Sequence, residues 1–197
     1  MALFKHRVRF LYLLGLAYLF FSFQVSNILF SCTYSRERKP TGPQVQKIKQ
    51  AILLFTTKPK NIAEPVFLIK GGQCYNAWAD SNASLIIISQ RIIDEFSTKD
   101  LAGILGHEFG HLILSSKQVP VRKQMQKHWE VDIIGAELTS KQTMIGANER
   151  QIYSYNQFFK EHKMLKFTLP LVYRDYIRIV TDYELRNNKV GEKGGLS

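Results

Sequence analysis

The stretch IIDEFSTKDLAGILGHEFGH, residues 92–111, decides the fold of this chain, because it combines a helix start signal with two histidines at helical spacing. Ser97 is a good N-cap residue, and Asp100 follows in the first turn. One face of the predicted helix carries an apolar stripe: Leu101, Ile104, Leu105, Leu112 and Ile113. His107 and His111 are four residues apart, so they project from one side of this helix.

This spacing predicts a zinc site with hydrolytic chemistry. The imidazoles of His107 and His111 can bind one tetrahedral ion, and Glu108 lies beside the first ligand. Zinc lowers the pKa of a water to about 7, and the Glu108 carboxylate can then take its proton as general base. Gly110 leaves room for close packing beneath the site. The alternative is that the two histidines only pair with neighbours, but two imidazoles and a carboxylate in apolar surroundings are costly without a metal.

The rest of the chain predicts an α+β domain that is mainly helical. Apolar periodicity indicates helices at 44–55, 92–96, 97–113, 122–142, 148–163 and 171–186, and β-branched runs indicate strands at 66–69, 75–79 and 85–88. The order of one helix, a small sheet and several helices indicates a small antiparallel sheet. The predicted domain is 44–190, residues 33–43 form a linker, and the tail VGEKGGLS is expected to be mobile.

Residues 1–32 are predicted to direct export. Positive charges stand near the start, at Lys5, Arg7 and Arg9. They precede a stretch from 10 to 35 without any charge, which is the layout of a secretory signal. It ends in Leu29-Phe30-Ser31-Cys32, which resembles a bacterial lipobox and implies a lipidated Cys32. The alternative is an uncleaved signal anchor, since residues 8–30 are long enough to span a bilayer. Both interpretations place a membrane-anchored domain outside the cytoplasm, facing a periplasm or the exterior.

The composition excludes several classes of protein. Apolar residues make up 45% of the 197, which excludes a disordered or fibrous chain. The net charge is +11, but the basic residues are dispersed and no nucleic-acid-binding motif accompanies them, so no nucleic-acid partner is expected. Two cysteines cannot form a disulfide framework, and Cys74 is expected to be a small buried residue in a strand.

The segment Cys74-Tyr-Asn-Ala-Trp-Ala79, the strand SLIIIS and residues 92–111 together resemble metallopeptidases of the CAAX-prenyl-protease and HtpX type. That family includes periplasmic lipoprotein members. The resemblance extends from Val66 to about Leu138 and implies a zincin-like domain with a protein or peptide substrate. In this family a later helix supplies the third zinc ligand, usually a Glu four residues before an Asp.

The matching segment here is His128-Trp-Glu-Val-Asp132, so the resemblance implies His128 as the third ligand of one zinc ion per chain. Imidazole is chemically competent for this role. Asp132 shares a helix face with His128 and is expected to orient a ligand imidazole. Glu130 is the second candidate, although it lies about 200° around the helix from His128. If His128 is only a surface residue, His162 is the next histidine to consider.

The resemblance also implies a place for the substrate. An extended peptide is expected to add to the sheet at the strand Ser84–Ser89, which precedes the predicted helix that carries His107, Glu108 and His111. The expected substrate-binding residues are Asn76, Ala77, Ser84 and Ile86. The alternative is that this strand is central and fully paired, as its two-sided apolar run favours. Tyr173 and Arg174 are candidates for stabilising an oxyanion, by similarity to a His-Pro segment of the family.

Two functions fit these features. The first is a membrane-tethered zinc endopeptidase that acts on exported or envelope proteins. The second is a catalytically weak pseudo-peptidase that acts as a chaperone or adaptor for envelope proteins, which only the substitution at His128 favours. Glu108 argues for the enzyme, because binding alone does not require that carboxylate.

Overall fold

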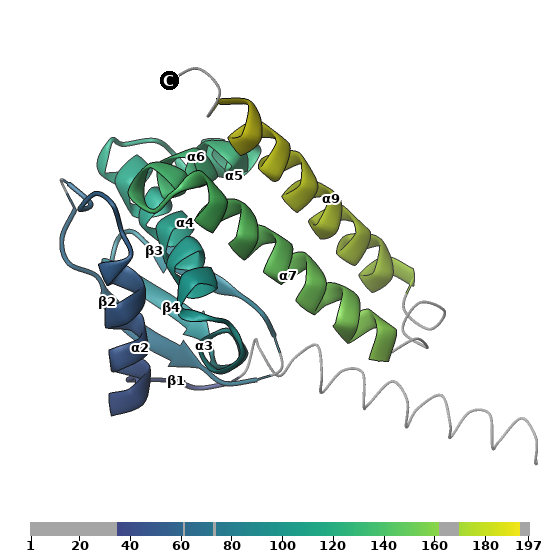
Figure 1. Ribbon diagram of the computed structural model, residues 1–197, viewed down its shortest axis with the longest axis horizontal. Coiled ribbons are helices and arrows are strands. Elements are labelled where there is room, and N and C mark those ends of the chain that lie inside the picture. Colours follow the sequence, from purple (N-terminus) through teal and green to yellow (C-terminus); the bar gives the residue numbers. More distant parts are fainter. Residues whose placement is uncertain (1–34, 61, 73, 162–169, 194–197) are drawn as a thin grey trace, which may run out of the picture.

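Helices dominate the computed structural model of the chain, which describes residues 35–60, 62–72, 74–161 and 170–193 (Figure 1). The elements in chain order are β1 (Glu37–Arg38), α2 (Gly42–Leu53), β2 (Val66–Lys70), β3 (Ala77–Asp80), β4 (Leu85–Ser89), α3 (Gln90–Glu95), α4 (Thr98–Ser116), α5 (Val121–Gln126), α6 (His128–Leu138), α7 (Lys141–Glu161) and α9 (Pro170–Lys193). The predicted α+β, mainly helical class is confirmed.

The four strands form one mixed sheet in the order β1-β2-β4-β3. β1 pairs with β2 and β3 pairs with β4 in antiparallel fashion, but β2 and β4 are parallel. The expectation of a purely antiparallel sheet is therefore wrong for this central pair. The physical reason is the strand order. β3 lies at the edge of the sheet, outside β4, and β4 then runs between β2 and β3 in the same direction as β2. β4 has a neighbouring strand on each side and is buried except at Leu85, which explains its continuous apolar run.

The core forms where α2 and α4 pack against the sheet (Figure 1). The predicted stripe of α4 is buried, with Ile113 partly exposed, and Ser97 caps the helix by accepting a hydrogen bond from the backbone N–H of Asp100. α2 begins at Gly42, where Thr41 and Gln44 form a capping box. Two residues of the predicted linker form β1, so the linker belongs partly to the sheet.

The predicted helix 122–142 is divided among three helices: α5, α6 and the first residues of α7. Lys127, with φ −126° and ψ 50°, separates α5 from α6, and Thr139 ends α6 before α7 starts at Lys141. Apolar periodicity continues across both breaks, so the sequence pattern alone did not indicate them. α9 runs back along α7 and continues to Lys193, beyond the predicted end of that helix and into the tail expected to be mobile (Figure 1).

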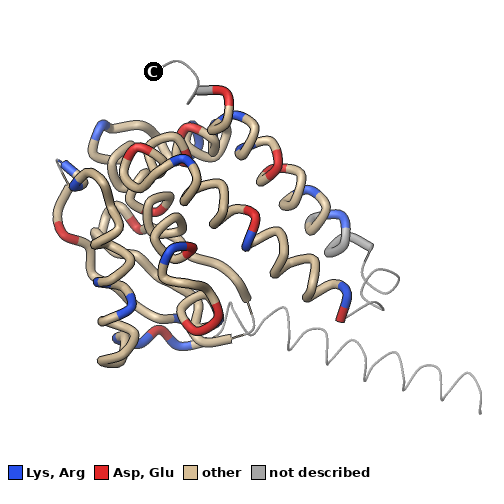
Figure 2. Tube along the Cα trace, in the orientation of Figure 1, with Lys and Arg blue, Asp and Glu red and all other residues tan. Residues whose placement is uncertain are grey.

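The N-terminal signal or anchor lies outside the described residues. Within the ranges that the structure describes, no helix has both the length and the apolarity needed to cross a membrane. Lys and Arg are spread over the helices and strands rather than gathered on one of them (Figure 2). Cys74 is half-buried, takes part in a disulfide and precedes β3, so the expectation of a small buried residue within a strand is wrong.

Glycines allow the backbone of α4 to contact the backbone of α6 directly, with no side chain between them at these positions. A Cβ atom at Gly110 would lie 2.7 Å from the backbone oxygen of Val131. A Cβ atom at Gly135 would lie 3.0 Å from the backbone nitrogen of His107. These distances are shorter than ordinary van der Waals contact, so the two helix backbones touch, as the sequence predicts for Gly110. This contact places the histidines of α4 beside the first turns of α6.

Gly110→Ala should lower the free energy of unfolding by about 1–3 kcal/mol, because the new methyl group meets backbone atoms that cannot rotate away. The matched control is Gly146→Ala in α7, where a Cβ atom meets nothing within 4 Å. That change should raise stability by about 0.5–1 kcal/mol, since alanine favours a helix interior. Urea unfolding of both variants measures the difference. Equal effects of the two changes would contradict the close contact.

Candidate metal centre

α4 carries the first half of the site. His107, Glu108 and His111 lie in its middle, where the helix passes between the sheet and α6. His107 and Glu108 are buried, and His111 is half-buried. The apolar neighbours in α4 face the core, so the same burial that stabilises the helix removes water from the imidazoles.

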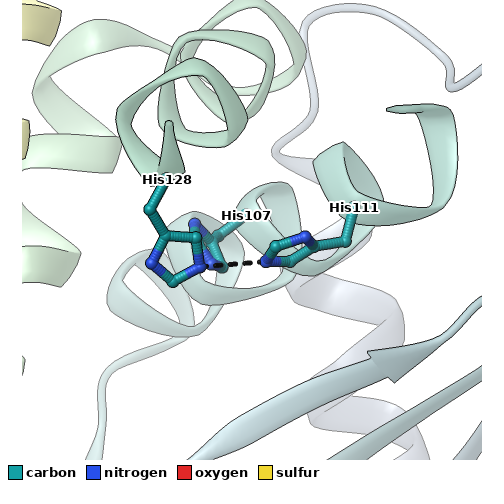
Figure 3. Close-up of side chains that lie close together, drawn as sticks. All are labelled: His107, His111 and His128. Carbon is teal, nitrogen blue, oxygen red and sulfur yellow. Dashed lines mark hydrogen bonds between the residues drawn. The ribbon is translucent and has the colours of Figure 1, made fainter. Parts of the chain in front are cut away.

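α6 supplies the third imidazole. His128 is the first residue of α6, and its ring meets those of His107 and His111 (Figure 3). One potential ligand atom from each of the three residues lies within 4.8 Å of the others. The Nε2 atoms of His111 and His128 are 3.1 Å apart. Two nitrogens bound to one tetrahedral zinc ion are separated by about 3.4 Å at ordinary Zn–N distances, so this spacing fits a shared metal ion.

The Nδ1 atoms of the three rings face separate partners. His107 Nδ1 lies 2.5 Å from Asp132 Oδ1, and His111 Nδ1 lies 2.9 Å from Gln124 Oε1. His128 Nδ1 is 3.8 Å from the Asp182 carboxylate. Acceptors at Nδ1 favour the tautomer in which Nε2 keeps its lone pair, which is the arrangement that a metal-binding histidine needs.

Asp132 holds a network of buried groups. It has no exposed surface, and Arg186 of α9 donates from Nε to Oδ2 at 2.6 Å and from Nη2 to Oδ1 at 2.8 Å. Asn148 of α7 donates to Oδ2 at 3.1 Å. Burial opposes the ionised carboxylate, but the neighbouring His107 and Arg186 outweigh it and hold the pKa of Asp132 well below its usual range. The sequence-predicted role of Asp132 beside a ligand imidazole therefore agrees with its position.

The histidines of α4 are neutral near pH 7. Burial lowers the pKa of His107 more than the nearby Asp132 raises it. Burial likewise lowers the pKa of His111, partly opposed by its hydrogen bond with Gln124. A neutral imidazole is the form that binds a metal, because protonation removes the lone pair.

Glu108 has one carboxylate oxygen without a partner. Its Oε2 is buried and has no hydrogen bond to any residue that the structure describes. The carboxylate accepts a hydrogen bond from the backbone N–H of Ala79 in β3. Burial, the largest influence, raises the pKa of Glu108 to about 8. An unpaired buried acceptor beside three converging imidazoles suits a group that takes a proton from a bound molecule.

A cavity of about 290 Å³ opens over these groups. Its wall includes the three histidines, Glu108, Asn76 and Ala77, together with Trp78, Ala79, Val121, Met125, Tyr183 and Arg186. Polar and apolar side chains both line this cavity, which suits a small-molecule or peptide site.

Other sequence candidates lie away from this cavity. Glu130 pairs with Lys127 at 3.1 Å and is not part of the histidine cluster. Ile86 is fully buried, and Ser84 lies in the turn before β4 with φ 47°. Arg174 is exposed and does not line the cavity, while the side chain of Tyr173 and all of His162 lie outside the described residues.

β4 offers no free edge, because it pairs with β2 on one side and β3 on the other. The expectation that a substrate adds to β4 through Ser84 and Ile86 is therefore wrong, and the alternative of a central strand is correct. The edge strands of the sheet are β1 and β3, and β3 is the one beside β4.

Sequence reasoning missed three groups of the site: Gln124, Asn148 and Arg186. Arg186 offered a signal, because it shares a helix face with Tyr183 and Val190 and an arginine within such a stripe requires a buried partner. Gln124 and Asn148 carry no comparable signal, since buried amides cannot be told from exposed ones by sequence spacing.

The fold and the His-Glu-His arrangement define the class as a zincin-type metallopeptidase, and comparison with protein families agrees. Residues 41–173 match peptidase family M48, which is more than half of the chain. The chain therefore belongs to peptidase family M48, a family of zinc-dependent peptidases, which confirms the predicted resemblance. Comparison with curated proteins found no match, and comparison with solved structures found none.

Proposed function

We propose that this member of family M48 is a zinc-dependent endopeptidase that hydrolyses peptide bonds in exported or envelope proteins. The observation that carries the proposal is the meeting of His107, His111 and His128 beside the unpaired carboxylate oxygen of Glu108. Three histidines with a neighbouring carboxylate suit a catalytic zinc site, in which three protein ligands leave one position for water or substrate.

The donor set fits zinc. Three neutral imidazoles are suitable ligands for this ion, and acceptors behind His107 and His111 orient them. When bound, zinc lowers the pKa of a water molecule and polarises a substrate carbonyl. The charge of a dication also favours the ionised form of Glu108, against the effect of burial. Glu108 would then accept the proton of this water molecule at Oε2 and pass it to the leaving amine.

The substrate is proposed to extend along β3. In an antiparallel pair, alternate residues direct their backbone groups away from the partner strand. The backbone oxygen of Asn76 accepts a hydrogen bond from Ser89, so the backbone groups of Ala77 and Ala79 face the open edge. The contact between the Ala79 N–H and Glu108 agrees with this direction. A peptide paired with this edge lies over the histidines and beside Asn76 and Ala77.

The pseudo-peptidase alternative depended on an incomplete set of ligands. His128 lies with His107 and His111, so the chain has three suitable donors despite its departure from the usual glutamate. No described feature then favours a chaperone or adaptor over an enzyme.

Removal of His128 tests the ligand set. His128→Ala should weaken zinc binding by more than about 100-fold, which exceeds the usual effect of changing a group behind a ligand. Glu130→Ala is the matched control on the same helix and should leave the affinity nearly unchanged, because Glu130 pairs with Lys127. His128→Glu should keep a working site. Competition with a fluorescent chelator measures all three. If Glu130→Ala lost zinc and His128→Ala retained it, the assignment would be wrong.

Glu108→Gln tests the chemistry. The change keeps the shape of the side chain but removes its ability to take a proton, so proteolysis should fall by at least about 10²- to 10⁴-fold while one zinc ion per chain remains bound. Activity is measured on unfolded casein and on a fluorogenic peptide library, and Glu137→Gln at the exposed end of α6 is the control. Loss of zinc together with activity would show that Glu108 is a ligand and not the base.

Export to a membrane-facing compartment is the remaining part of the proposal. The charge-free stretch 10–35 after three basic residues supports it. The disulfide at Cys74 also supports it, since disulfides persist mainly in oxidising compartments. Lipidation of Cys32 and an uncleaved anchor are the two forms of membrane attachment that the sequence offers.

Fractionation of cells that express the full chain tests this localisation. The protein should remain with membranes, and protease added outside the cytoplasmic membrane should degrade it. Cys32→Ser should leave its size and membrane retention unchanged if the segment is an anchor. Release or altered processing of this variant would instead establish lipidation. Recovery of the wild-type chain from the cytoplasm would refute export.

A further inference from the structure

α5 is a short helix whose residues are almost all exposed. Val121 and Met125 are 64% and 60% exposed, and Gln124 is the one buried residue of this helix, at 3%. Apolar burial therefore does not explain how α5 docks. Its single buried side chain is a polar amide, and burying an amide is costly unless each of its groups has a partner.

The amide of Gln124 is fully paired. Its nitrogen donates one hydrogen bond to Ser115 Oγ at 3.0 Å and another to the backbone oxygen of Val119 at 2.8 Å. Its oxygen lies 2.9 Å from Nδ1 of His111. Both amide hydrogens are thus used at the end of α4 and in the loop that follows it, and only the oxygen faces the imidazole.

The orientation of this amide is determined by the Val119 carbonyl. If the amide were rotated by 180°, its oxygen would face that carbonyl, and two acceptors would be in contact. The turn that ends α4 fixes the carbonyl in place: Gln118 has φ 59°, and the Val119 N–H donates to Leu114 at 3.0 Å. The loop backbone therefore decides which amide atom His111 meets.

We propose that Gln124 is a positioning residue that holds the proton of His111 on Nδ1, so that Nε2 presents its lone pair to the metal. This inference rests on the proposed zinc site. An oxygen that can only accept requires a donor at Nδ1, and a neutral imidazole carries one proton. Gln124 thus does for His111, with a neutral amide, what the Asp132 carboxylate does for His107.

The first measurement needs no variant. In ¹⁵N-labelled full-length protein, with metal removed by chelation, the imidazole nitrogen signals should show the proton of His111 on Nδ1. In Gln124→Met, which keeps the side-chain length but has no acceptor for the imidazole proton, this preference should disappear. A proton on Nε2 of His111 in the wild-type protein would overturn the proposal, whatever zinc does.

The second measurement is zinc affinity by chelator competition. Gln124→Met should weaken binding by roughly 10- to 100-fold. Gln44→Met is the control, because Gln44 is also a buried amide but belongs to the capping box of α2. If Gln124→Met kept both the tautomer and the wild-type affinity, the role of Gln124 would be limited to joining the loop to α5.

The two measurements separate this inference from the proposed function. If the wild-type chain binds no zinc, the proposed function fails, while the tautomer of His111 still decides whether Gln124 positions the ring. If zinc binds normally but the tautomer of His111 is independent of Gln124, the positioning role fails and the proposed function stands. Should Gln124→Met not fold, the tautomer of His111 in the wild-type protein remains decisive.

Discussion

The buried carboxylate of Asp132 is the contact on which the arrangement of the helices depends. A charge without solvent is costly unless several partners surround it. Those partners come from three different helices: His107 of α4, Asn148 of α7 and Arg186 of α9. Because all of them must reach one side chain of α6, satisfying this single charge fixes how α4, α6, α7 and α9 are placed. The same contact orients a ligand imidazole, so the stability of the fold and the geometry of the site share one cause.

The glycine contacts explain why this network can form at a short distance. Gly110 and Gly135 bring the backbones of α4 and α6 together, and the long side chains then meet beside the contact rather than through it. Helices separated by ordinary side chains lie about 8–10 Å apart, and at such a distance His107 and Asp132 would need a different geometry. Small residues in α4 are therefore as much a part of the site as the histidines.

Local signals in the sequence were sufficient for much of this structure. The spacing of His107 and His111, the cap at Ser97 and the apolar stripe of α4 predict the central helix correctly, because each depends only on residues a few positions apart. The position of His128 followed from resemblance to a family. The sheet pairing did not follow, because whether β3 or β4 lies beside β2 depends on contacts across the sheet. Arg186 was missed for the same reason, because Asp132 lies 54 positions away in the sequence. Gln124 was missed although its partners are near in sequence, because nothing local marks its amide as buried.

The place of Arg186 has a consequence for folding kinetics. This residue reaches a histidine that is 79 positions earlier in the chain, and contacts of such separation form late because loop closure costs entropy before the contact stabilises anything. A partly folded chain with α4 and α6 already packed would hold its histidines together but would leave Asp132 without its guanidinium. We therefore expect the metal centre to reach its final geometry only when α9 packs against α6 and α7. Incompletely folded chains should then bind metal weakly and be slow to hydrolyse other copies of the protein.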